Sequence, residues 1–260
     1  MPPTSSEPAA AIDWIAPDPP VRIERPLLSQ AWRHCAFLHW PYDPEAIRPH
    51  VPSAFELDLH DGRAWVGLVS FRIAHMNPGR RLPPIPGLRT AHESHLRTYV
   101  RGPDGRRGIW MFSLDMAPLQ AAALGRAMWF PYRWATNEVR AGADRARYRT
   151  RRRSSGGGGL RLDLDLGAAI PADELTRFDH FLTARWVLYT GLGPISAGLL
   201  VEHPRWVFRR VTARRIEQTL TDRAGFPRPE VAPLVHYSDG VDALLSWPRL
   251  SGRGGRSATT

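Results

Sequence analysis

The sequence predicts an α+β protein built on a closed or highly curved β-sheet with only a few helices. Many short segments alternate apolar and polar residues with a period of two, and turn signals separate them at short spacing. Stretches with helical periodicity are few and short. Because one face of each such strand must be buried, a sheet that curls around its own core accounts for the pattern.

Two hairpins follow one another in the first half of the chain. The first places residues 55–59 opposite residues 64–68, with Asp61-Gly62 as a two-residue turn, and leaves one face uniformly apolar. The second joins residues 92–101 to residues 108–116 through the turn GPDGRR. Both indicate antiparallel pairing of neighbouring strands.

A third hairpin carries a stripe of arginines. Residues 145–153 place an arginine at every second position, and after SSGGGG residues 160–166 alternate leucine with charged residues. Pairing Arg151 with Asp163 sets charge opposite charge. A basic strand can follow a polynucleotide backbone. A partly neutralised, solvated face is the favoured interpretation, so we do not expect a nucleic-acid partner.

The remaining elements are shorter patterns. Further strands are predicted at residues 186–191, 195–202, 207–217 and 234–247. A short helix should begin at Asp43-Pro44, since a capping residue precedes proline at the first helical position. Two more helices are predicted, one over the alanine-rich residues 118–130 and one over residues 173–185, which carry apolar residues on one face.

One domain should hold all these elements. Residues 1–25 are rich in proline and predict a disordered arm, residues 26–250 form the body, and residues 251–260 predict a disordered tail. No apolar run is long enough for a membrane helix, and the N-terminus lacks a signal-peptide pattern. A single cysteine, Cys35, excludes an internal disulfide, so we expect a cytoplasmic protein.

The chain contains no lysine, and all 35 of its basic residues are arginines. This composition excludes lysine Schiff bases and lysine general bases, because arginine stays protonated and is a poor proton acceptor. The formal net charge of +10 is consistent with an acidic ligand or with a genomic preference for arginine. The sequence shows no zinc-binding spacing, phosphate loop or dinucleotide fingerprint, so we expect no metal and no cofactor.

The segment HESHLRTYVR places Glu93, His95, Arg97 and Tyr99 on one face of a strand. Inside a barrel this stripe could line a ligand chamber, where Arg97 holds a carboxylate and Glu93 or His95 moves a proton. The alternative is an exposed face with a cross-strand ion pair of little energetic consequence.

Two aromatic segments are further candidates for a binding site. Trp129 to Trp134 surround a proline with aromatic rings and an arginine, and could wall an apolar pocket with Tyr132 as hydroxyl donor. A helix end packed into the core explains the same residues. His203 lies in the cluster EHPRW at a strand end. It could act as an acid or a base, or it could be a structural residue.

Several longer motifs resemble the bacterial YqjF-like family of unknown function. They are HWPYDPEAIRPHVPSAFELDLHDGRAWVGLVSFRI, ESHLRTYVRGPDGRRGIWMFSLD, FPYRWA, FLTARWVLYT and VEHPRW, and they cover about residues 30–248. That family looks like a relative of acetoacetate decarboxylase. The resemblance implies a single closed antiparallel β-barrel with a central cavity and a few flanking helices.

The resemblance also bears on particular residues. Glu93 looks like the counterpart of a cavity glutamate of the decarboxylases, and His95 stands where YqjF-like chains usually have asparagine. The decarboxylase lysines follow a proline, and here Tyr132 and Arg133 follow Pro131. Schiff-base decarboxylation therefore does not carry over with the fold.

These observations leave two hypotheses for function. In the first, the cavity binds a small organic acid or carbonyl compound, with Arg97 and Arg133 on the anionic group and with Trp129 and His203 in the wall. Glu93, His95 and Tyr132 then act as non-covalent acid–base groups in a lyase, isomerase or dehydratase. In the second, the barrel binds a ligand or partner without turnover. The sequence does not decide whether the protein forms a homo-oligomer.

Overall fold

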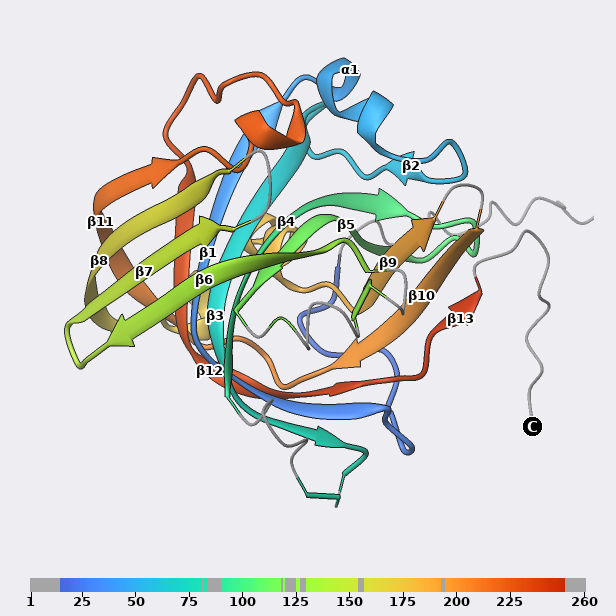
Figure 1. Cartoon of the computed structure of the whole chain (residues 1–260), viewed down its shortest axis with the longest axis horizontal. Coiled ribbons are helices and arrows are strands. Elements are labelled where there is room, and N and C mark those ends of the chain that lie inside the picture. The colour runs from blue at the N-terminus through green and yellow to red at the C-terminus, as the bar shows by residue number, and fades with distance from the viewer. Residues whose placement is uncertain are drawn as a thin grey trace, which may run out of the picture.

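The computed structural model describes residues 15–250, except residues 81, 84–89, 118, 120–124, 127–129, 154–156 and 193–194. The described chain is mostly β-sheet with few helices, as the sequence predicts (Figure 1). All thirteen strands belong to a single sheet. No helix in these described ranges is long and apolar enough to cross a membrane.

The elements have the following bounds. The strands are β1 (Leu28–Tyr42), β2 (Glu56–Leu57), β3 (Ala64–Pro78), β4 (Ala91–Arg101), β5 (Arg107–Met116), β6 (Tyr132–Ala141), β7 (Arg145–Arg152), β8 (Gly159–Ala169), β9 (Val187–Leu192), β10 (Ile195–Glu202), β11 (Phe208–Gln218), β12 (Leu234–Leu245) and β13 (Arg249–Leu250). The α-helices are α1 (Pro44–Ile47) and α3 (Arg177–Thr183), and short 3-10 turns span Arg48–His50, Ala172–Glu174 and Asp222–Ala224.

The strand pairings form two rings that share β12, β1, β3, β4 and β5. The first ring runs from β5 through β6, β7, β8 and β11 to β12. The second runs from β5 through β9 and β10 to β12. In Figure 1 the strands found only in the first ring, β6, β7, β8 and β11, lie on the left, and β9 and β10 lie on the right.

The expectation of a purely antiparallel sheet is wrong at two places. β5 pairs in parallel with β6 and with β9. Parallel strands cannot be joined by a tight hairpin, and the 15 residues between β5 and β6, 117–131, are enough for the longer connection that they need. All other pairings are antiparallel.

Four of the shared strands, β1, β3, β4 and β5, have stretches that are buried on both faces. Successive side chains of a strand point to opposite faces, so Leu38, Leu68 and Leu96 pack into one apolar core with the leucines of β8. Phe37 and Val69, on the opposite face, belong to a second core. Every residue of β4 is buried except His92 and Arg101, which are half-buried.

The second predicted hairpin is confirmed and the first is wrong in its pairing. Residues of β4 face those of β5 from Arg101 opposite Arg107 to Glu93 opposite Met116. In the first hairpin the turn forms a bridge between His60 and Arg63. However, β2 pairs with β4, because β3 is already paired with β1 on one side and with β4 on the other.

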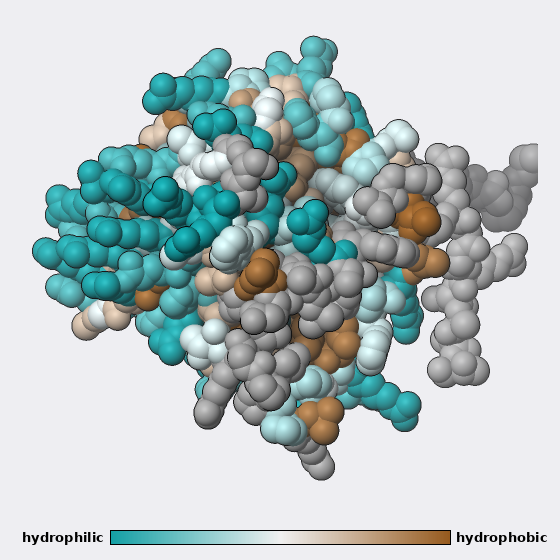
Figure 2. Space-filling view, in the orientation of Figure 1, coloured by the Kyte–Doolittle hydropathy of each residue, from teal (hydrophilic) through white to brown (hydrophobic). Residues whose placement is uncertain are grey.

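The third hairpin forms with a different register. Asp163 lies opposite Arg147, not Arg151, and Arg151 lies opposite Gly159, because the pairing extends into the glycine-rich segment. The shift of four residues is even, so the arginines still share one face. That face is exposed, and Figure 2 shows the surface over β6, β7 and β8 as hydrophilic.

Most other elements match the predictions. The strands β9 to β12 fall in the predicted segments, and Asp43 caps α1. α3 is shorter than predicted, because Thr176 and Asp179 form a capping box that starts the helix there. The sequence analysis missed β1, whose buried stretch lacks alternation, and β6. Most of the helix predicted at 118–130 lies outside the described residues.

Part of the predicted N-terminal arm packs against the body. Ile15 and Ile23 are buried, and the backbone N–H of Ile23 donates to Glu202 Oε2 at 2.5 Å. Ile15 and Ile23 therefore hold this segment against the body where a disordered arm was predicted, while the other residues of 15–25 are exposed or half-buried. Residues 1–14 and 251–260 lie outside the described residues.

A buried ion pair between β5 and β7 supports the first ring. Arg152 donates to both carboxylate oxygens of Asp115, at 2.6 and 3.0 Å, and to Ser113 Oγ at 2.7 Å. We expect Arg152→Met to lower the free energy of unfolding by about 3–5 kcal/mol, because it leaves a buried carboxylate without a partner. Urea denaturation measures this change.

The neighbouring residue provides the matched control. Arg151 is exposed, so Arg151→Met should change the free energy of unfolding by no more than about 0.5 kcal/mol. Equal losses from the two substitutions would show that the buried pair contributes nothing specific.

Candidate active site in a buried cavity

The second ring encloses a cavity of about 150 Å³. Its walls are mostly apolar side chains from β1, β3, β5, β9 and β10. A small number of polar side chains interrupt this wall: Gln30, Glu93, His95, Arg97, Tyr132, Thr183, Arg185 and His203. An apolar pocket with a few convergent polar groups is the usual form of a small-molecule site.

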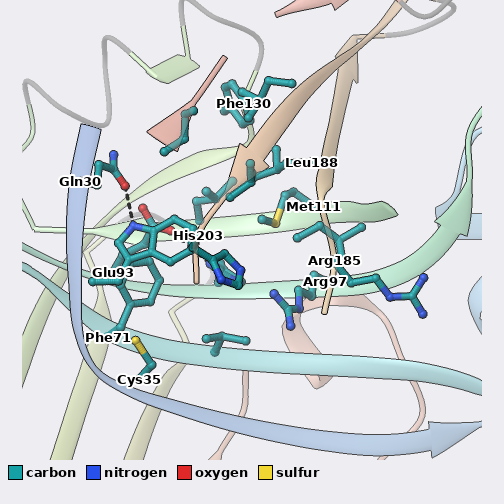
Figure 3. Close-up of a pocket in the computed structure, with 18 of the residues that line it drawn as sticks. Gln30, Cys35, Phe71, Glu93, Arg97, Met111, Phe130, Arg185, Leu188 and His203 are labelled. Carbon is teal, nitrogen blue, oxygen red and sulfur yellow. Dashed lines mark hydrogen bonds and ion pairs between the residues drawn. The ribbon is translucent and has the colours of Figure 1, made fainter. Parts of the chain in front are cut away.

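Five of the residues singled out in the sequence line this one cavity. They are Glu93, His95, Arg97, Tyr132 and His203. Figure 3 shows Glu93 beside Phe71 and Cys35, with His203 between that side and the arginines 97 and 185. The alternative of an exposed stripe on β4 is wrong, because Glu93, His95 and Arg97 are only 5–6% exposed.

One predicted residue does not line the cavity. Arg133 follows Tyr132 on β6, so its side chain points to the opposite face, where it is exposed across from Asp115. The structure therefore does not bring Arg133 to the ligand space. Trp129 lies outside the described residues.

Glu93 holds two neighbouring side chains by hydrogen bonds. His95 Nδ1 lies 3.1 Å from Glu93 Oε1, and the Tyr132 hydroxyl donates to Glu93 Oε2 at 3.2 Å. An ionised carboxylate only accepts hydrogen bonds, so the proton of the imidazole belongs on Nδ1. The other ring nitrogen of His95, Nε2, carries the lone pair and has no partner among the described residues.

Burial controls the protonation of these groups. It lowers the pKa of His95 below its usual value of 6.5, although the carboxylate of Glu93 works in the opposite direction. Burial and Glu93 together raise the pKa of Tyr132 well above 10. Near neutral pH the site therefore holds a neutral imidazole and a protonated phenol.

Arg97 is a buried cation without a carboxylate partner. Its Nη2 donates to the backbone oxygen of Leu182 at 3.2 Å, and its guanidinium lies 5.8 Å from the ring centres of Phe37 and Tyr99. Within the described part of the chain, no carboxylate lies within ion-pairing distance of it. A buried, unneutralised guanidinium favours an anionic ligand.

Sequence reasoning missed a second buried arginine in the wall. Arg185 lies within a motif that supported the family resemblance, but nothing in its spacing indicated a buried position. Its Nη1 donates to Asp58 Oδ2 at 2.5 Å, and its guanidinium stacks on Tyr99 and Phe181. Burial lowers the pKa of Arg185 to about 10, so it stays charged and is neutralised by Asp58.

His203 forms part of an aromatic wall. Its ring centre lies 4.6 Å from that of Trp186 and 4.7 Å from that of Trp206. Its Nδ1 lies 2.6 Å from the backbone oxygen of Pro204, so that nitrogen carries the proton. Burial lowers the pKa of His203 to about 4, which makes it a neutral wall residue at physiological pH.

The described residues contain no group of three or more His, Cys, Asp or Glu that could hold a metal ion. The polar groups of the cavity fit acid–base chemistry better than metal ligation, because Glu93 and His95 bond to each other. The expectation that no cofactor is needed stays a prediction.

Solved structures define the class to which this fold belongs. The chain is similar to an acetoacetate decarboxylase-like enzyme from Sphingomonas wittichii RW1 (TM-score 0.54, 12% identity, 86% of this chain and 91% of that one). It is also similar to acetoacetate decarboxylase from Legionella pneumophila (0.57, 14%, 96% and 98%). The enduracididine biosynthesis enzyme MppR complexed with pyruvate is a third such structure (0.60, 12%, 88% and 91%). These likenesses show an acetoacetate decarboxylase-like fold.

The family within that class is also clear. Residues 29–242 match the model of the DUF2071 family, described as an uncharacterized conserved protein. The chain is 34% identical over 224 residues to the uncharacterized protein YqjF of Bacillus subtilis strain 168, covering 85% of this chain and 91% of that protein. The chain therefore belongs to the DUF2071 family, and the predicted resemblance is confirmed.

The protonation state of His95 is directly testable. We expect a neutral ring with its proton on Nδ1 and a pKa below 6.5. Glu93→Gln should lower that pKa further, because it removes the carboxylate that favours the imidazolium. Long-range ¹H–¹⁵N NMR across a pH series measures both the tautomer and the pKa.

A half-buried histidine beside an exposed aspartate serves as the control. His60 Nδ1 lies 3.2 Å from Asp61, and Asp61→Asn should leave the titration of His95 unchanged. A rise in the pKa of His95 after Glu93→Gln would contradict the assigned hydrogen bond.

Proposed function

We propose that this protein binds a small organic acid or carbonyl compound inside a sheet that closes as a barrel, and moves a proton on it by non-covalent acid–base catalysis. The observation that carries the proposal is the buried Glu93–His95 pair, whose imidazole has a free ring nitrogen and a neutral resting state. Lyase, isomerase and dehydratase reactions all use such a step.

The reaction step assigns a role to each polar group. His95 Nε2 accepts a proton from a carbon next to the ligand's carbonyl, and the electron pair of that C–H bond moves into an enolate. The carboxylate of Glu93 stabilises the imidazolium that forms, and His95 returns the proton to another position of the ligand. Arg97 holds an anionic group of the ligand.

Two observations support a ligand of this class. The cavity has apolar walls and a buried cation that no carboxylate of the described chain neutralises. The structurally similar MppR is described in complex with pyruvate and with its condensation product with imidazole 4-carboxaldehyde. No side chain of this protein can form a Schiff base with the ligand, because the sequence has no lysine.

A second candidate is a ligand-binding protein without turnover. The Tyr132 hydroxyl donates to Glu93 and not to the ligand space, which also suits a site that only binds. Nucleic acid is not proposed, because acidic residues face several arginines of the exposed stripe, as in the pairs Arg147–Asp163 and Arg145–Asp165. A cytoplasmic location and a homo-oligomer stay predictions.

Deuterium exchange into keto acids distinguishes the two candidates. The wild-type protein in D₂O should accelerate exchange at the carbon next to the carbonyl of at least one keto acid with three to six carbons, followed by ¹H NMR. His95→Gln should slow this exchange by about 100-fold or more. Arg97→Leu should mainly raise the KM for ligands that carry a carboxylate.

His75→Gln is the matched control, because His75 is an exposed histidine of β3 and should leave the rate unchanged. A protein that binds a keto acid tightly, yet exchanges it no faster than buffer does, is a binding protein, and the catalytic proposal then fails.

A further inference from the structure

A glycine on β3 creates a small niche inside the second ring. Gly67 pairs with His39 of β1 on one side and with Arg97 of β4 on the other. Directly paired residues of neighbouring strands present their side chains on the same face. Because Gly67 has no side chain, His39 and Arg97 lean toward each other over its backbone.

The two neighbours converge on one point above Gly67. A Cβ atom built at Gly67 would lie 3.3 Å from Arg97 Nε and 3.3 Å from His39 Nε2. A ligand atom held just beyond that position is within reach of both nitrogens at once. The niche therefore has the shape of a two-donor site for one oxygen atom.

Both nitrogens lack partners among the described residues. His39 is fully buried, and neither of its ring nitrogens makes a hydrogen bond; Arg97 Nε is also buried and unpaired. Buried polar groups are nearly always hydrogen-bonded, so Arg97 Nε and His39 Nε2, which both lie near this point, require an explanation. A ligand acceptor atom supplies it.

The charges around the niche favour an anion. The groups that act electrostatically on His39 are His236, Arg97 and Arg185. Asp179 bonds to His236, and Asp58 bonds to Arg185, so these two carboxylates are already engaged. Arg97 keeps a positive charge without a carboxylate partner, and a metal ion would be repelled by it.

We propose that His39 and Arg97 form the carboxylate subsite of this protein, with one carboxylate oxygen seated above Gly67 between Arg97 Nε and His39 Nε2. The proposal rests on the proposed function and adds two residues, His39 and Gly67, which lie in a motif of the family resemblance but were given no role there. His39 donates as a neutral imidazole, with its proton on Nε2. The other carboxylate oxygen points toward the cavity that Arg97 also lines.

Calorimetric titration with paired probes tests the subsite. The probes are keto acids of three to six carbons, from pyruvate to 5-oxohexanoate, and the neutral methyl ketones of matching length. Wild-type protein should bind at least one keto acid about 10-fold or more tightly than its neutral counterpart. Gly67→Ala fills the niche without removing a polar group, and should abolish that preference while leaving ketone binding within about 2-fold.

Further variants separate the niche from the fold. His39→Leu should also remove the preference for the carboxylate. Gly142→Ala and His75→Leu are the matched controls, because a Cβ at Gly142 meets nothing within 4 Å and His75 is exposed. Retained binding of the neutral ketone reports that each variant is folded.

The outcomes distinguish the two proposals. If Arg97→Leu abolishes the preference but Gly67→Ala and His39→Leu do not, the subsite is wrong and the proposed function stands. If Gly67→Ala weakens acid and ketone equally, the niche is a packing feature and the subsite is again wrong. If wild-type protein binds no member of the panel, both proposals fail.

Discussion

The burial of both faces of β4 is the constraint on which the site depends. Side chains of a strand alternate between faces, so Leu96 packs into the apolar core of the first ring while its neighbours His95 and Arg97 enter the second ring. A register slip of one residue would put the charged groups into the apolar core and the leucine into the cavity. The same alternation thus specifies the fold and the location of the polar groups.

Burial determines the protonation states of His95 and Tyr132 in the cavity. Burial favours the neutral forms of His95 and Tyr132, and both side chains are hydrogen-bonded to the carboxylate of Glu93. Tyr132 reaches Glu93 because the parallel pairing sets it opposite Leu114, near the end of β5 that faces Glu93. The irregular, parallel part of the sheet therefore completes the hydrogen-bonded cluster.

Local patterns could predict the strands and much of the site, but not the partners of each strand. Period-two polarity placed Glu93, His95 and Arg97 on one face. Two of the three hairpins that it predicted form between the predicted segments. The wrong partner of β2 and the missed β1 both reflect tertiary pairing, which alternation does not encode. His39 was overlooked because it lies in a nearly continuous apolar run that reads as core.

Tyr132 occupies a position at which the side chain decides what chemistry is possible. By the family resemblance, the decarboxylases carry lysines where this chain has the residues after Pro131, and an amine at that place would attack a carbonyl. Tyr132 instead keeps its proton and donates a hydrogen bond to Glu93. It can therefore neither form an imine nor act as a phenolate. The carboxylate is then free to orient His95 through its other oxygen. On the function proposed above, the imidazole of His95 takes the reactive role, because no amine stands at this position.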